Sequence, residues 1–179
     1  PKALDRDPKL KQFFADRLKG ISKEKRTQTV ENFKKFMDGE LTWAEIKKVP
    51  KWMLKLLAKF AYTKFKMREY ANAETMFKAL AIVDHNNWYY RAGLGAVYQK
   101  QKKFDQAIDE YSIALTIKED EVTSLVNRGE CFIQLQDLDA AMEDFAEVIK
   151  LGLPKNNPWR MRAQILSQRV LTMKGTNNE

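Results

Sequence analysis

Three consecutive copies of a 34-residue pattern occupy residues 54–87, 88–121 and 122–155, and this repeat constrains the fold more than any other feature of the chain. The copies are small at the eighth position, alanine at the twentieth and aromatic at the twenty-fourth: Ala61, Gly95 and Gly129; Ala73, Ala107 and Ala141; Phe77, Tyr111 and Phe145. Two helices approach closely only where side chains are small, and a ring can then fill the space between neighbouring units. Because one such unit cannot bury its apolar face alone, we expect the units to stack.

A period of 34 residues with this pattern is typical of the tetratricopeptide repeat, a helix–turn–helix unit. We therefore predict an all-α fold: a tetratricopeptide-repeat superhelix with three helix-turn-helix repeats, an N-terminal helical region and a C-terminal capping helix. The predicted helix pairs are 51–66 with 70–83, 88–101 with 104–117, and 122–135 with 138–151.

The three repeats, residues 54–155, have a predicted region on either side. We expect a basic N-terminal helical extension at 1–53 and a C-terminal capping helix and tail at 156–179. In the extension, Thr42 and Glu45 have the spacing of a capping box. A helix before it carries more large apolar groups than an isolated helix can bury, so they pack on the first repeat or on another chain. The residues that we predict to support a homodimer are Val30, Phe33, Phe36 and Met37.

Composition favours a folded chain in a reducing compartment. Hydrophobic residues make up 44% of the chain, which excludes a disordered protein, and no apolar run is long enough for a transmembrane span. Residues 1–20 lack the continuous apolar centre of a signal peptide, and the single Cys131 rules out an internal disulfide. We interpret Cys131 as a small buried residue of a packed helix.

The net charge of +8 is distributed unevenly. Residues 1–53 carry 14 Lys and Arg against 8 Asp and Glu, and residues 156–179 carry 4 against 1. Such basic ends fit an acidic partner or nucleic acid. We favour the other interpretation, a lysine-rich surface whose role is solubility.

The sequence contains no constellation that predicts catalysis, a metal site or a cofactor. The one histidine, His85, lies in the predicted turn between the first two repeats, where a solvated polar residue is the ordinary interpretation. Phosphate loops, Cys/His clusters and serine nucleophile elbows are missing from the sequence. We therefore predict a protein that is not an enzyme.

The inner face of the first helix in each repeat is the predicted binding surface. Its positions recur at helical spacing and are mostly apolar, small or aromatic, which suits an extended peptide with a few apolar anchors. The alternative is that these side chains belong to the core. The residues that we predict to bind peptide are Tyr62, Phe65, Tyr89, Ala92, Ala96, Gln99, Val126 and Ile133.

Another class of tetratricopeptide protein grips an acidic C-terminus with Lys, Arg and Asn at these inner positions. Here the corresponding fifth and ninth positions are Ala58 and Tyr62, Ala92 and Ala96, and Val126 and Glu130. The Lys, Arg and Asn residues that would bind a C-terminal carboxylate are absent from these positions. The sequence therefore disfavours a co-chaperone that binds C-terminal carboxylates.

Residues 36–151 resemble the translocator chaperones of bacterial type III secretion, a small tetratricopeptide class. The stretches that carry the resemblance are Phe36–Gly39, Ala79–His85, Gly93–Ala96, Asp109–Ser112, Gly129–Cys131 and Gln134–Ala141. The resemblance implies a bacterial cytoplasmic chaperone without ATPase activity. It implies that the chaperone binds an extended N-terminal segment of hydrophobic translocator proteins in its concave groove and so keeps them export-competent. It also implies that the chaperone forms a homodimer through its own N-terminal helices.

Two other functions fit the sequence. The chain could be a general tetratricopeptide scaffold that joins proteins without a secreted client, or a basic protein that binds nucleic acid through its ends. Aromatic groups on the inner face favour the two protein-binding functions, because nucleic-acid binding depends on phosphate contacts and falls steeply with salt.

Overall fold

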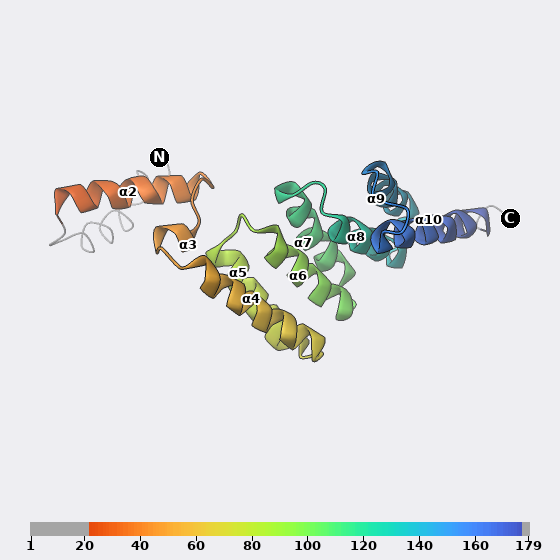
Figure 1. Ribbon diagram of the computed structural model, residues 1–179, viewed down its shortest axis with the longest axis horizontal. Helices are drawn as coiled ribbons and strands as arrows, with labels where there is room; N and C mark the ends of the chain where they lie inside the picture. Colours follow the sequence, from red (N-terminus) through yellow and green to blue (C-terminus); the bar gives the residue numbers. More distant parts are fainter. Residues whose placement is uncertain (1–21, 177–179) are drawn as a thin grey trace. The chain divides into compact units, whose positions relative to one another are not determined.

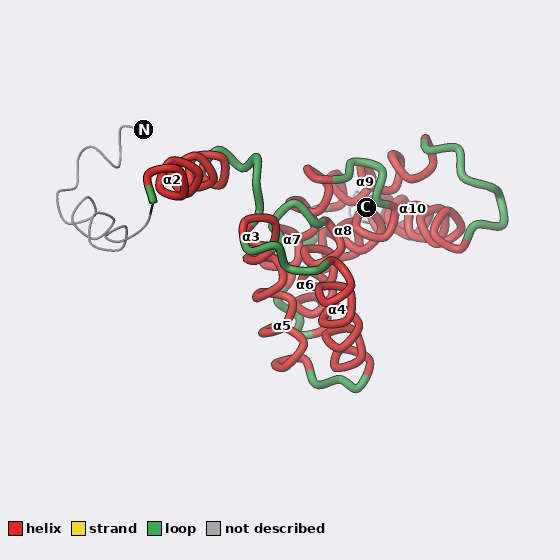
Figure 2. The backbone as a smooth tube through the Cα atoms, turned by 60° about the vertical axis from the view of Figure 1, so that its left-hand side comes forward, coloured by secondary structure: helices red, strands yellow, loops and turns green. Residues whose placement is uncertain are grey.

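The computed structural model describes residues 22–176 as helices joined by loops (Figures 1 and 2). The chain divides into two compact units at the Val49–Pro50 bond. The helices of the first unit are α2 (Lys23–Met37) and α3 (Trp43–Ile46). The helices of the second unit are α4 (Lys51–Lys66), α5 (Tyr70–Val83), α6 (Trp88–Lys100), α7 (Phe104–Ile117), α8 (Val122–Gln134), α9 (Leu138–Lys150) and α10 (Pro158–Thr176). The described residues hold no helix that is both long and apolar enough to cross a membrane.

In the first unit, α2 and α3 are fixed by caps at their amino ends. The side chain of Ser22 accepts a hydrogen bond from the Lys25 amide and so caps α2, which begins at Lys23. The capping box is present as predicted: the Glu45 amide donates to Thr42 Oγ1 (3.2 Å), and the Thr42 amide donates to Glu45 Oε2 (2.7 Å).

The second unit confirms the all-α tetratricopeptide superhelix. The six repeat helices begin at the predicted residues, and their ends differ by at most one residue from the prediction. Each is packed against the next along the chain, as Figure 1 shows for α4 to α9. The turn inside each repeat is also the same, because its fifteenth residue has a left-handed backbone: φ is 61° at Arg68, 60° at Lys102 and 63° at Gln136.

Within a repeat, the small residue at the eighth position lies against the aromatic residue at the twenty-fourth, as the repeat pattern predicts. A Cβ added to Gly95 would lie 2.9 Å from Tyr111 Cδ1, and one added to Gly129 would lie 2.5 Å from Phe145 Cε1. Both glycines are therefore needed for close approach of the two helices in a repeat.

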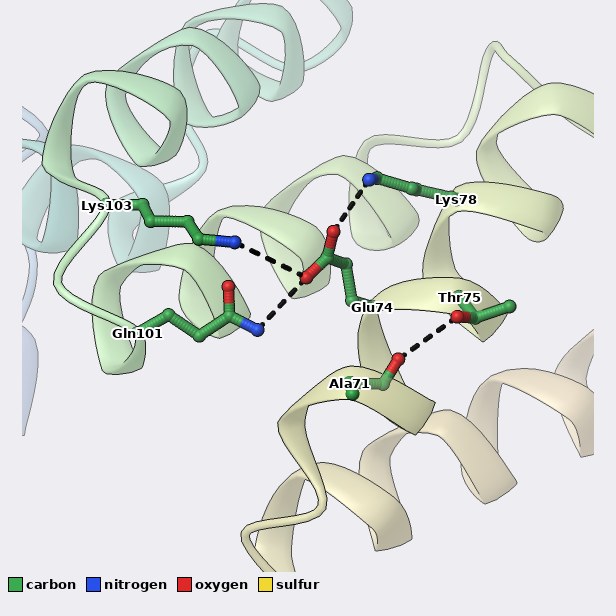
Figure 3. Close-up of polar contacts among 6 residues, drawn as sticks. All are labelled: Ala71, Glu74, Thr75, Lys78, Gln101 and Lys103. Atoms are coloured by element: carbon green, nitrogen blue, oxygen red, sulfur yellow. Dashed lines mark hydrogen bonds and ion pairs between the residues drawn. The ribbon is translucent and has the colours of Figure 1, made fainter.

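Polar side chains also join successive repeats. Glu74 of α5 accepts from Lys78 Nζ (2.6 Å) and from Gln101 Nε2 (3.0 Å), and Lys103 Nζ lies 3.9 Å away (Figure 3). The hydrogen bond from Lys78 is the main reason that the pKa of Glu74 is lowered. In the next junction, Arg128 makes two hydrogen bonds to Asp144 and one to Ser112 of the preceding repeat.

The C-terminal helix α10 packs against α8 and α9, which agrees with the predicted cap. Its Ala163 and Val170 are fully buried in a cluster with residues of the third repeat. Asn157 caps the helix, because its side-chain oxygen accepts from the amides of Trp159 and Arg160. The helix α10 thereby covers the apolar face of the last repeat, as a stack of repeats requires.

Candidate peptide-binding groove

A hollow of about 190 Å³ lies on the inner side of the first two repeats. We call it the client hollow; its wall is mostly aromatic and small on α4, α5 and α6, and polar at the start of α8. Its lining residues are Tyr62, Phe65, Phe77, Trp88, Tyr89, Ala92, Gly93, Ala96, Glu121, Thr123 and Asn127.

The structure brings five of the eight predicted peptide-binding residues together in this hollow: Tyr62, Phe65, Tyr89, Ala92 and Ala96. The Tyr62 and Phe65 rings are stacked at 6.2 Å between centroids, and Tyr89 meets Phe77 edge-on at 6.4 Å. Ala92 and Ala96 lie one turn apart on α6 and leave space between these rings. Tyr62 and Tyr89 are 47% and 38% exposed, so both rings present apolar surface to a ligand.

Gln99, the sixth predicted residue, supports the groove from beyond the hollow. Its Oε1 accepts a hydrogen bond from the Tyr111 hydroxyl (3.0 Å), and its Nε2 donates to Glu130 Oε2 (3.1 Å). Arg162 of α10 also binds Glu130, at 2.6 Å. The Gln99 amide therefore connects the second repeat to the third repeat and, through Glu130, to the C-terminal helix.

The remaining two predicted residues, Val126 and Ile133, are in the core instead. Their exposed fractions are 0% and 5%, and both belong to the apolar cluster that α8 shares with α9 and α10. The prediction that they line the groove is wrong. They lie two turns apart on one face of α8, and that face is buried among the helices of the third repeat and its cap.

Sequence reasoning missed several residues of the client hollow, chiefly Trp88 and Phe77. The repeat pattern assigns Phe77 to packing, and it is indeed only 1% exposed, but its ring also forms the floor of the hollow. Gly93 lies over that ring: an added Cβ would be 2.5 Å from Phe77 Cε1. A second glycine two residues before Gly95 was the available signal, because close backbone approach is a common reason for glycine inside a helix.

The polar wall of the client hollow comes from the start of α8. Glu121 caps that helix: its carboxylate oxygens accept from the Thr123 amide (3.3 Å) and the Ser124 amide (2.6 Å). The residue is buried in this position, with only 6% of its surface exposed. Glu121 thus acts as a structural group, and the side chains of Thr123 and Asn127 complete the wall.

A second hollow, of about 410 Å³, adjoins the first between α4 and the amino end of α6. We call it the lysine hollow. It shares three residues with the client hollow, namely Tyr62, Trp88 and Tyr89. Its other lining residues are Lys55, Ala58, Lys59, Asn87 and Tyr90.

Burial changes the pKa of two titratable groups in the repeat helices. Burial raises the pKa of the Cys131 thiol to about 12, so the thiol is neutral at physiological pH and a poor nucleophile. Burial also raises the pKa of Tyr89. Within the described part of the chain, no three His, Cys, Asp or Glu residues gather in a way that could hold a metal ion.

Comparison with known proteins supports the repeat assignment. The tetratricopeptide repeat family model matches residues 122–151. The fold matches that of a crystal structure of a T3SS complex from Aeromonas hydrophila, with a TM-score of 0.76 and 26% identity over 81% of this chain and 98% of that chain. The chain therefore has the tetratricopeptide-repeat fold.

Two further similar proteins are a named chaperone and a protein known in complex with a chaperone binding region. The chaperone protein SicA of Salmonella typhimurium is 30% identical over 104 residues; the match covers 58% of this chain and spans 63% of the length of SicA. PcrH of Pseudomonas aeruginosa, solved in complex with the chaperone binding region of PopD, has a TM-score of 0.67 at 26% identity and covers 70% of this chain and 96% of that chain. The resemblance to type III secretion translocator chaperones, predicted from the sequence, is therefore confirmed.

Proposed function

We propose that this tetratricopeptide protein is a type III secretion chaperone, which binds hydrophobic translocator proteins in the bacterial cytoplasm and keeps them soluble and export-competent. The observation that carries the proposal is the client hollow, which has an apolar floor and two exposed tyrosine rings. It belongs to a fold that PcrH shares, and PcrH is known in complex with the chaperone binding region of PopD.

The client hollow suits an extended segment with apolar anchors. Its volume of about 190 Å³ is enough for one or two aliphatic side chains, with Ala92 and Ala96 as the pocket and Tyr62 and Tyr89 as its walls. Asn127 and Thr123 offer amide and hydroxyl groups that can pair with the backbone of such a segment. We propose Phe65 as a further contact and Gln99 as the residue that holds this wall against the third repeat.

The proposed activity is binding without chemistry. The related proteins are named chaperones, and neither a nucleophile nor a metal site is part of the proposal. We therefore propose a non-enzymatic protein that uses no cofactor and acts in the cytoplasm before export.

The experiment that tests the proposal is client capture from the native cell, with captured proteins identified by mass. Wild type is expected to retain a hydrophobic secreted protein, whereas Ala96→Trp and Tyr89→Glu lose it with their helical content kept. Ala79→Trp, at an exposed position of α5 away from the hollow, is the matched control. Equal capture by all four proteins would contradict the proposed site.

Calorimetry with a peptide from the captured protein then separates apolar groove binding from binding through the basic ends. Loss of one buried anchor is expected to weaken binding by about 2 kcal/mol or more. An affinity that collapses entirely with salt would move the site to the basic ends of the chain.

We also propose that the first unit supports a homodimer. Val30 is 46% exposed on α2, and Phe36 lies 5.2 Å from Trp43 between ring centroids. The side chains of the other two predicted residues, Phe33 and Met37, lie outside those that the structure describes. Light scattering on wild type and on Phe33→Asp/Met37→Asp tests the proposal: a dimer that becomes a monomer supports it, and a wild-type monomer at every accessible concentration ends it.

A further inference from the structure

The lysine hollow differs from the client hollow in charge. Its lining contains two ammonium groups, Lys55 and Lys59, and no carboxylate. The two lysines are one turn apart on α4, so both side chains leave the same face of that helix. Among the residues that line it, Asn87 donates a hydrogen bond to an acid outside the hollow, Asp84, at 3.2 Å.

Other charges along the groove already have partners within the described residues. Glu121 caps α8, and Glu130 is bound by Arg162. Near the amino end of α6, Lys118 lies 4.8 Å from the Trp88 ring centroid and 4.0 Å from Asp120. In contrast, neither Lys55 nor Lys59 has an ion-pair partner among residues 22–176. The charge that the groove leaves available to a ligand is therefore positive and is located on α4.

The walls of the lysine hollow connect it to the client hollow. Tyr62, Trp88 and Tyr89 border both hollows, so a ligand group in one lies a single aromatic ring from a group in the other. Lys55 and Lys59 are both exposed, so their attraction for a carboxylate is modest and is screened by salt. An extended chain advances about 3.3 Å per residue, so neighbouring hollows are reached by side chains within about three residues of each other.

We propose that the lysine hollow selects clients with an acidic side chain close to the apolar anchor, and that Lys55 and Lys59 bind its carboxylate. This inference rests on the proposed function, because the apolar anchor must occupy the client hollow. It adds a specificity that the client hollow lacks: an Asp or Glu within about three residues of the anchor distinguishes a client from other apolar segments.

Selection from a display library of random dodecapeptides tests the proposal and does not require the natural client. Wild type is expected to enrich peptides with apolar anchors and with Asp or Glu near them. Lys55→Gln/Lys59→Gln is expected to enrich the anchors without the acid. The control, Lys100→Gln/Lys102→Gln, makes the same charge change at exposed positions outside both hollows and is expected to select as wild type does.

A selected peptide and its version with Asp or Glu replaced by Asn or Gln provide the quantitative measurement. On wild type at low salt, the acidic version is expected to bind about fivefold more tightly, and the difference should shrink at high salt. On Lys55→Gln/Lys59→Gln the two versions should bind equally.

Each outcome of these experiments has a distinct meaning. Apolar anchors enriched by wild type without any acid would overturn the lysine hollow and leave the proposed function intact. Two outcomes would overturn the proposed function: the peptides enriched by wild type have no apolar anchors, or the Ala96→Trp variant enriches the same peptides as wild type. An acid preference that survives Lys55→Gln/Lys59→Gln would place the carboxylate elsewhere and overturn the assignment to α4.

Discussion

The first and third repeats have the same offsets, yet the inner faces of their first helices have opposite surroundings. In the first repeat, Tyr62 and Phe65 of α4 line the client hollow. In the third, Val126 and Ile133 of α8 are buried in the cluster shared with α9 and α10. Position in the repeat therefore decides which residues share a face, and the neighbouring helix decides whether that face binds a ligand or forms core.

The sharpest test of this difference is truncation of one inner-face residue in each repeat. Ile133→Ala removes a core side chain and is expected to lower the free energy of unfolding by about 2–5 kcal/mol. Tyr62→Ala removes a half-exposed ring and is expected to cost much less stability while weakening client binding. Urea unfolding and calorimetry check the two effects. Equal losses of stability would mean that Tyr62 is also core.

The eighth position of the repeat gives a second contrast. The first repeat accommodates a methyl group there as Ala61, whereas a Cβ at Gly129 would lie 2.5 Å from the Phe145 ring. Gly129→Leu is expected to cost about 1–3 kcal/mol through overpacking. Thermal melting measures it, with Gly175→Leu as control because nothing lies within 4 Å of a Cβ there. An unchanged melting temperature for Gly129→Leu would show that the repeat register is wrong.

The cap on the third repeat can be loosened without touching its core. Arg162→Met removes the ion pair between Arg162 and Glu130. The Arg162 side chain is 46% exposed and the Glu130 side chain is 21% exposed. The expected loss of stability is about 0.5–1 kcal/mol at most, because a partly exposed pair is screened by solvent. Hydrogen exchange should show faster opening of α10 and unchanged protection of α4. Faster exchange in α4 as well would indicate that the whole stack opens as one unit.

The smallest expected effect is at the junction of the first two repeats. The pKa of Glu74 is lowered in the folded protein, chiefly by the hydrogen bond from Lys78, so its contribution is present above the ordinary carboxyl pKa of 4.5 and disappears as pH falls through the lowered value. Glu74→Gln is expected to cost less than about 1 kcal/mol near neutral pH and nothing in strong acid. Urea unfolding of both proteins across this range provides the check, and a difference that persists in acid would contradict an ionic origin.

The repeat units could be predicted from the sequence because each depends on local chemistry. A left-handed turn residue and a small–aromatic pair recur at the same offsets, so the limits of the helices followed from the period alone. The groove formed by the first two repeats followed from the same spacing. Five residues of the client hollow were predicted in this way.

The errors at Val126 and Ile133 have a different origin. Burial of these residues depends partly on α10, whose position no repeat offset encodes because this helix lies outside the periodic part of the chain. Trp88 was missed because it is the first residue of its repeat, and the helical spacing used to select inner-face residues does not include that position. The lysine hollow was missed because Lys59 lies outside the spacing used to select inner-face positions, and only the fold places Lys55 and Lys59 beside α6.

The turn residues Arg68, Lys102 and Gln136 leave room for engineering. Their left-handed backbone conformation is unfavourable for most residues that have a Cβ. Glycine and, to a lesser degree, asparagine adopt it at lower energetic cost. None of the three lines either hollow. Glycine or asparagine at these three positions is therefore expected to stabilise the protein and to leave the lining of both hollows unchanged.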